Sequence, residues 1–129
     1  MILLTVQSHI EINDAMAAIK LNDGSGSIVM ERIGAVSLAD GSGSINMKDV
    51  NGNVTLQDGS GSINISQVAG DIEVSDVSGS INIDQVNGKV TISDGSGGIN
   101  VSHTQGLEIV NAGSGGVNHQ YIDECVIIN

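Results

Sequence analysis

Apolar and polar residues alternate along this chain in short runs that recur about every 18 residues. In the most regular copy, residues 76–93 (DVSGSINIDQVNGKVTIS), the apolar residues occupy repeat positions 6, 8, 11, 15 and 17, counted from the aspartate. The neighbouring copies are apolar at the same five positions, and a glycine-rich DGSG-type tract opens each of them. Such alternation between glycine-bearing turns is typical of short β-strands, because frequent glycine and β-branched residues disfavour a helix.

The repeats account for nearly the whole chain. Copies begin near residues 5, 23, 40, 58, 76, 94 and 112, which makes 1–129 one domain of about seven coils. One pair of five-residue strands buries little apolar surface, so each copy must stack on its neighbours. The sequence therefore predicts an all-β fold, a single-stranded parallel β-helix (β-solenoid) with ladders of isoleucine and valine inside. We expect the right-handed sense, which parallel crossovers favour.

The copy that begins at residue 94 departs from this register. Leu107 and Ile109 fall one position early, so a strand that kept its phase would bury Glu108. A shortened turn at Gly106 and a bulge near Asn111 would return both apolar residues to the interior without burying the carboxylate. We therefore predict an irregularity at these two points.

Composition and charge exclude several classes of function. The chain has 129 residues, with 4 Lys+Arg against 15 Asp+Glu, a formal net charge of −11 and an aromatic content of 1%. Such a protein lacks the basic surface and the stacking platforms of nucleic-acid binders, and it lacks a polybasic patch for anionic membranes. We expect no membrane insertion, because no apolar run approaches the roughly 20 residues of a span. The first six residues are too short for a signal peptide, so the residues alone leave the localisation open.

An aspartate opens five successive repeats. In stacked coils these carboxylates would lie about 5 Å apart, a spacing at which like charges repel and a cation such as Ca²⁺ is attracted. The Asp-Gly-Ser-Gly sequence also favours an Asx turn, in which the carboxylate accepts backbone N–H groups of its own loop. We favour turn capping, with calcium as the alternative and no other cofactor expected. The residues concerned are Asp23, Asp40, Asp58, Asp76 and Asp94.

A second polar column is predicted on the outside of the coils, at repeat position 7. It comprises Asn46, Asn64, Asn82, Asn100 and Asn118. Serines flank it at position 5, namely Ser27, Ser44, Ser62 and Ser80. Stacked asparagine amides can hydrogen-bond from one coil to the next, which is the favoured interpretation. The alternative is that a flat Ser/Asn face docks a glycan or another surface ligand.

Catalytic chemistry has little support in the sequence. The histidines lie outside the regular copies, and His119 replaces the apolar residue at position 8 of the last coil; the other two are His9 and His103. His103 and His119 could approach Asp123 or Glu124 as a metal or acid–base cluster, although polar residues in terminal repeats usually serve as caps. No serine has histidine and aspartate partners at a recognisable spacing, and the GSG turns lack the lysine and helix of a phosphate loop. We therefore predict that the protein is not an enzyme.

The first and last predicted strands raise the question of assembly. Both are apolar and neither is followed or preceded by a capping helix, so their open edges could stack head to tail into a filament. Other domains of a larger protein could cover them instead. The candidate interface residues are Ile2, Leu3, Leu4, Val6, Val126, Ile127 and Ile128. The single cysteine, Cys125, is expected to be an inert thiol, with an intermolecular disulfide as the alternative.

Three tracts carry a resemblance to a known family: VNGNVTLQDGSGSI at 50–63, VNGKVTISDGSGGI at 86–99 and GLEIVNAGSGGV at 106–117. They resemble the repeats of a bacterial adhesin-type β-solenoid family of unknown function, over residues 5–129. More distantly, the chain is similar to the bactofilin cytoskeletal β-helices, whose rods polymerise end to end. The family resemblance implies export to the periplasm or cell surface and offers no catalytic residues.

From the pattern and the resemblance together we expect a non-enzymatic structural or adhesive β-solenoid scaffold of the bacterial cell envelope. The first alternative is a self-assembling filament subunit that polymerises through its terminal coils. The second alternative is a calcium-stabilised binding module that uses the aspartate column.

Overall fold

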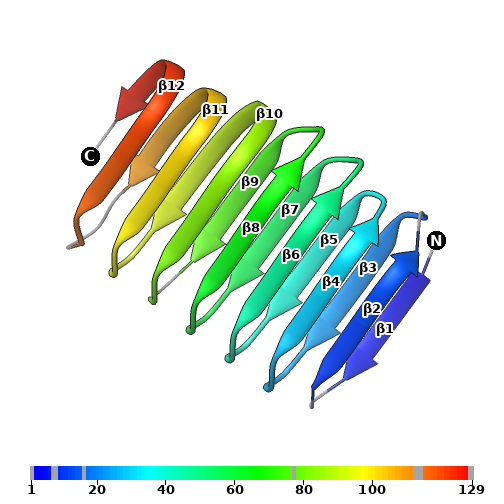
Figure 1. The fold of residues 1–129 in the computed structure, drawn as a ribbon. Helices are drawn as coiled ribbons and strands as arrows, with labels where there is room; N and C mark the ends of the chain where they lie inside the picture. The colour runs from blue at the N-terminus through cyan, green and yellow to red at the C-terminus, as the bar shows by residue number, and fades with distance from the viewer. Residues whose placement is uncertain (1, 7–8, 16, 77, 112–114, 128–129) are drawn as a thin grey trace.

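The computed structural model describes residues 2–6, 9–15, 17–76, 78–111 and 115–127, and within them the fold is all-β. The strands stack as the rungs of a rod, and the two ends of the chain lie at opposite ends of that rod (Figure 1). In chain order they are β1 (Ile2–Val6), β2 (Ile10–Ala15), β3 (Ile19–Asp23), β4 (Ile28–Ile33), β5 (Val36–Asp40), β6 (Ile45–Val50), β7 (Val54–Asp58), β8 (Ile63–Val68), β9 (Ile72–Asp76), β10 (Ile81–Asp94), β11 (Ile99–Asn111) and β12 (Val117–Ile127). No helix in the described part of the chain is long and apolar enough to cross a membrane.

Every strand pairs in parallel with the equivalent strand of the next coil. One stack contains β2, β4, β6 and β8, and the other contains β1, β3, β5, β7 and β9. Both stacks end on β10, which continues around the corner between them, and β11 and β12 follow. The chain is therefore a parallel β-solenoid, as the 18-residue repeat predicts, and it has about six turns where the repeats predict about seven coils. Its right-handed sense stays a prediction.

The interior is built from the five predicted apolar positions. From Ile28 to Ile109, the side chains at these positions are at most 4% exposed. At the two ends four equivalent residues are only partly buried: Ile12, Ala15, Val117 and Ile122. Repeat positions 6, 8, 11, 15 and 17 thus form continuous ladders, because each coil places like residue on like residue.

One corner of the coil explains why the apolar spacing lengthens from two residues to three between positions 8 and 11. The residue at position 10 is in the left-handed region in all seven repeats, with φ between 55° and 59°. This bend leaves positions 9 and 10 outside and returns position 11 to the interior. A non-glycine residue in this conformation costs about 1 kcal/mol, which the buried positions on both sides must offset. The residues are Asp14, Arg32, Asp49, Gln67, Gln85, His103 and Tyr121.

A second corner is the DGSG turn. Its second glycine has φ between 104° and 114° in five coils, a conformation that residues with a side chain rarely adopt. At Gly61 an added Cβ would also overlap the carbonyl oxygen of Gly43 in the preceding coil. The glycine is therefore required both by the backbone angle and by the close approach of stacked turns.

The predicted irregularity in β11 is confirmed. Leu107 pairs with Val90 and Ile109 with Ile92, and the register shifts before the first of these pairs and again after the second. Leu107 and Ile109 are buried, whereas Val110, the extra residue of the bulge, is 46% exposed. At the shortened turn the buried hydroxyl of Thr104 donates to the carbonyl oxygen of Gly106 at 3.3 Å.

Candidate functional site

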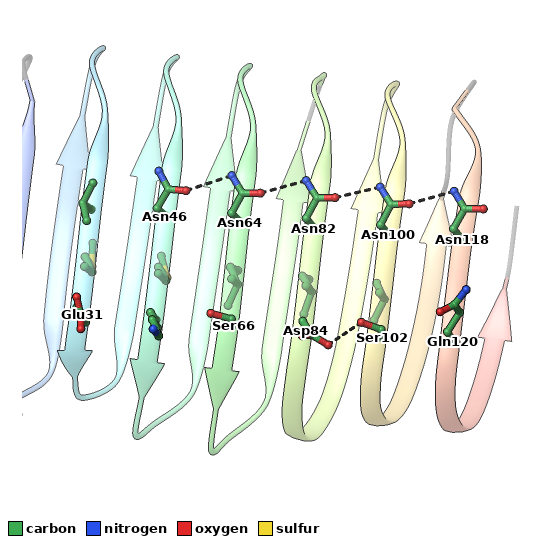
Figure 2. Close-up of a pocket in the computed structure, with 17 residues that line it drawn as sticks. Glu31, Asn46, Asn64, Ser66, Asn82, Asp84, Asn100, Ser102, Asn118 and Gln120 are labelled. Atoms are coloured by element: carbon green, nitrogen blue, oxygen red, sulfur yellow. Dashed lines mark hydrogen bonds between the residues drawn. The ribbon is translucent and has the colours of Figure 1, made fainter.

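The asparagine column forms the hydrogen-bonded ladder that the sequence predicts. In four successive steps the Nδ2 of one asparagine donates to the Oδ1 of the asparagine in the preceding coil, at 3.0–3.1 Å. Figure 2 shows the amides in one row along the axis of the rod. The ladder runs through Asn46, Asn64, Asn82, Asn100 and Asn118.

The register of the strands produces this geometry. Asn46 pairs with Asn64, and each later asparagine pairs with the next, so the side chains repeat at the strand spacing of about 4.8 Å. All the amides point the same way, and hydrogen bonds in such a chain polarise one another. Val29 occupies the equivalent position beside Asn46, so the ladder begins at Asn46.

A second row of polar side chains stands on the same face at position 9, two residues beyond the asparagines. The position between them points inward, as the buried Met47, Ile65 and Ile83 show. The two rows therefore flank a groove of about 720 Å³ that crosses β4, β6, β8, β10, β11 and β12 (Figure 2). The second row consists of Glu31, Lys48, Ser66, Asp84, Ser102 and Gln120. Because these residues differ in type, the sequence alone did not mark them as a set.

Asp84 organises one stretch of the second row. Its Oδ1 accepts a hydrogen bond from Oγ of Ser102 at 2.6 Å and lies 2.9 Å from Nδ1 of His103. The hydrogen bond from Ser102 is the main cause that holds the pKa of Asp84 below its ordinary value. The ring of His103 stacks on that of Tyr121, with centroids 4.7 Å apart. Asp84 of the groove wall is thus in contact with His103 of the left-handed corner.

For the predicted cluster of His103 and His119 with Asp123 or Glu124, the structure shows His103 against other partners. His103 contacts Asp84 and Tyr121, as described above, and His119 is an exposed residue of β12 opposite Val101. His9 is also exposed. Within the described residues, no group of three or more His, Cys, Asp or Glu side chains is placed to hold a metal ion. The surroundings of His103 are those of a side chain that links neighbouring coils.

The aspartate column is aligned by the backbone register. Asp23, Asp40, Asp58, Asp76 and Asp94 pair in succession along the second stack. Of their side chains the structure describes that of Asp58, which is 3% exposed and accepts the backbone N–H of Ser60 at 3.3 Å. Turn capping is therefore confirmed at Asp58. The other four side chains lie outside the described residues, and calcium binding by the column stays a prediction.

The candidate interface residues lie in the end strands. Ile2, Leu3, Leu4 and Val6 belong to β1, which pairs with β3, and Val126 and Ile127 belong to β12, which pairs with β11. The structure does not describe the side chains of these residues or that of Cys125, and Ile128 lies outside the described residues. The part of these residues in an interface therefore stays a prediction.

Sequence reasoning missed a set of side-chain contacts between coils. A third corner separates β6 from β7 and β8 from β9. There Asn53 Oδ1 accepts the backbone N–H of Asp71, and Asp71 Oδ1 accepts that of Lys89, both at 2.9 Å. Arg32 forms an ion pair with Asp14 at the left-handed corner, and the pair lowers the pKa of the Asp14 carboxyl. An Asn or Asp directly after the corner glycine was the available signal for the contacts at the third corner.

The comparisons with known proteins agree with this architecture. A family model described as Toastrack DUF4097 matches residues 6–125. The chain belongs to the Toastrack family. No curated protein and no solved structure matches the chain. The predicted resemblance to a β-solenoid family of unknown function is thereby confirmed at the level of the family, and a Toastrack β-solenoid is consistent with a non-enzymatic scaffold.

Proposed function

We propose that this Toastrack domain is a non-enzymatic scaffold of the bacterial cell envelope, on the periplasmic or outer surface, that adheres through the face bearing the asparagine ladder. The supporting observation is the ladder itself, four hydrogen bonds of 3.0–3.1 Å that hold five amides in a row beside a groove. The polar groups of this face run in rows along the rod instead of converging on one point. Such an arrangement suits repeated contacts with an extended partner.

Rigidity supports the adhesive role. Each ladder amide is already held by its neighbours, so a ligand that binds there orders few additional side chains and loses little affinity to that cost. The left-handed corner and the DGSG turn repeat without insertions through the described coils, which keeps the face straight over many strands (Figure 1).

Co-sedimentation with isolated bacterial envelope fragments tests the proposal, with two matched variants. Ser66 lies in the groove and pairs with Lys48 of the preceding coil, whereas Ser37 is exposed on the other stack and pairs with Lys20. Ser66→Arg places a large side chain in the groove, and Ser37→Arg adds the same charge outside it. We expect wild type and Ser37→Arg to sediment with the fragments in a saturable manner and Ser66→Arg to remain in the supernatant. Wild-type protein that does not sediment, or two variants that sediment equally, would overturn the adhesive role.

End-to-end association is a second candidate, supported by the ends of the stack. In the described part of the chain, β2 pairs with β4 alone and β12 with β11 alone. Val117 and Ile122 at one end, and Ile12 and Ala15 at the other, are less buried than their equivalents in the middle. An open parallel edge beside partly exposed apolar residues favours addition of another chain, and head-to-tail contacts of this kind do not close.

Electron microscopy of the purified chain, with light scattering over a range of concentrations, tests this second candidate. We expect rods that lengthen as the concentration rises. Particles of one constant mass at every concentration would exclude polymerisation.

A further inference from the structure

The groove between the two polar rows has the shape of a site for a linear ligand. It crosses six strands, which at about 4.8 Å per strand corresponds to a length of roughly 24 Å. Its volume of about 720 Å³ lies within the usual range of ligand-binding sites. The floor is flat, because the side chains between the rows, such as Ile65 and Ile83, point into the core.

The asparagine ladder leaves a regular supply of hydrogen-bonding groups along one wall. A side-chain amide has two N–H donors and two acceptor lone pairs. Asn64, Asn82 and Asn100 each use one donor and one acceptor within the ladder. Each therefore keeps one donor and one acceptor for a ligand, repeated once in every coil.

The facing wall adds groups of the same kind. Ser66 and Ser102 offer hydroxyls, Gln120 offers an amide, and Asp84 offers a carboxylate that Ser102 already orients. A ligand between the walls can thus meet donors and acceptors on both sides. Groups that donate and accept at neighbouring atoms, as hydroxyls do, match these walls best.

Other classes of ligand fit the groove less well. The formal net charge of −11 repels polyanions, and the ladder wall itself is built of neutral amides. An apolar ligand would find few apolar side chains, because those of the lining are buried except for the partly exposed Val29 at one end. A peptide strand needs a free backbone edge, whereas β6, β8, β10 and β11 each pair on both sides. A neutral chain rich in hydroxyl groups remains.

We propose that this groove binds a neutral linear glycan lying parallel to the axis of the solenoid, with successive sugars meeting successive coils. This inference rests on the proposed adhesive function and names its ligand. Every sugar of an extended chain carries hydroxyl groups, so such a chain can meet the ladder amides, which recur at the strand spacing of about 4.8 Å. Acidic polysaccharides are not the ligand, because the net charge of −11 repels them.

Isothermal titration calorimetry with two neutral hexasaccharides, the β-1,4-linked hexamers of glucose and of N-acetylglucosamine, tests the inference. We expect at least one hexamer to bind, with an affinity that rises from the disaccharide to the hexamer as more coils are engaged. Ser66→Arg should weaken binding by about tenfold or more, and Ser37→Arg should leave it unchanged. Circular dichroism shows that each variant is folded before titration.

The outcomes separate this inference from the proposed function. Absence of heat with both hexamers, or equal binding by the two arginine variants, would overturn the glycan site. If envelope fragments still retain wild type but not Ser66→Arg in that case, the adhesive function stands and its ligand belongs to another class. If the hexamers bind but wild-type protein does not sediment with envelope fragments, the glycan site is supported and the proposed role in the envelope is wrong.

Discussion

The asparagine ladder allows hydrogen bonds to be counted by mutation. Asn82 makes two ladder bonds, one to Asn64 at 3.1 Å and one from Asn100 at 3.0 Å. Asn46, at the start of the ladder, makes one, from Asn64 at 3.1 Å. Asn82→Ala and Asn46→Ala therefore remove the same side chain from equivalent positions but break different numbers of bonds. The difference between their free energies of unfolding isolates one step of the ladder.

The expected magnitude follows from the exposure of these amides. A hydrogen bond contributes about 0.5–1.5 kcal/mol net, and the lower end applies here because the freed amides can bond to water. We expect Asn46→Ala to lower the free energy of unfolding by about 0.5 kcal/mol and Asn82→Ala by about 1 kcal/mol. For a domain of this length the larger loss corresponds to a fall in Tm of about 3–5 °C. Polarisation along the ladder would widen the gap.

Urea denaturation followed by circular dichroism measures both losses. Ser37→Ala is the control, because Ser37 is exposed on the other stack and its loss should stay within about 0.5 kcal/mol. The reasoning fails if Asn46→Ala is as destabilising as Asn82→Ala, or if neither variant differs from the control.

Other perturbations test the core, the turns, the aspartate column and the groove wall. Ile83 is 2% exposed, so Ile83→Asp should abolish folding by burying an unpaired charge, whereas Ser66→Ala should leave the thermal melt nearly unchanged; equal melts would contradict the placement of these positions. Gly61→Ala should cost about 1–3 kcal/mol in urea denaturation, because φ of 111° is unfavourable for alanine and its Cβ meets the preceding turn. If the aspartates only cap their turns, calorimetry with Ca²⁺ should show neither heat nor a change in Tm, and a saturable signal would establish a metal site instead. The pKa of Asp84 is held below 3.8, mainly by Ser102, so the pair stabilises the fold above that pH and the contribution is lost as the pH falls through the lowered value. Asp84→Asn should therefore reduce stability at pH 7, with a difference from wild type that shrinks as the pH falls below 3.8, and a difference of the same size throughout would refute the assignment.

The interior could be predicted because burial leaves few choices. The inner positions are apolar in nearly every copy, and a shift by one residue would move a whole strand's apolar set to the surface. The same constraint located the irregularity in β11: burying Glu108 would be costly, so the chain had to shorten at Gly106 and bulge after Ile109. In the structure Glu108 lies outside and forms an ion pair with Lys89 at 2.6 Å.

The left-handed corner could not be predicted from residue types. Residues as different as Arg32, Gln67 and Tyr121 adopt the same φ, so no preference of the side chain for that region selects it. The selection comes from the buried residues on either side, which require a bend between positions 8 and 11. The wider spacing of apolar residues between positions 8 and 11 indicates that the chain bends there. It does not indicate which backbone conformation makes the bend.

The groove was likewise only half predictable. Its ladder wall repeats one residue type and was evident in the sequence, whereas the facing wall changes from Glu31 through Ser66 to Gln120. The fold alone makes the second wall, because position 9 is the last outward residue before the corner. Residues there share a location without sharing a chemistry.

The two walls of the groove should therefore affect different properties: the asparagine ladder affects both stability and ligand binding, and the second wall affects ligand binding alone. A change at Asn82 breaks bonds that connect coils, so it should alter both the melt and the binding of a ligand. A change at Ser66, for which the structure shows no side-chain bond to another coil, should alter binding alone. An arginine at position 66 would have Lys48 on one side and Asp84 on the other. Because Lys48 repels the new charge and Asp84 attracts it, we expect Ser66→Arg to change the stability of the fold little. A Tm unchanged from wild type, together with lost binding, would show that the second wall selects the ligand while the ladder holds the surface that presents it.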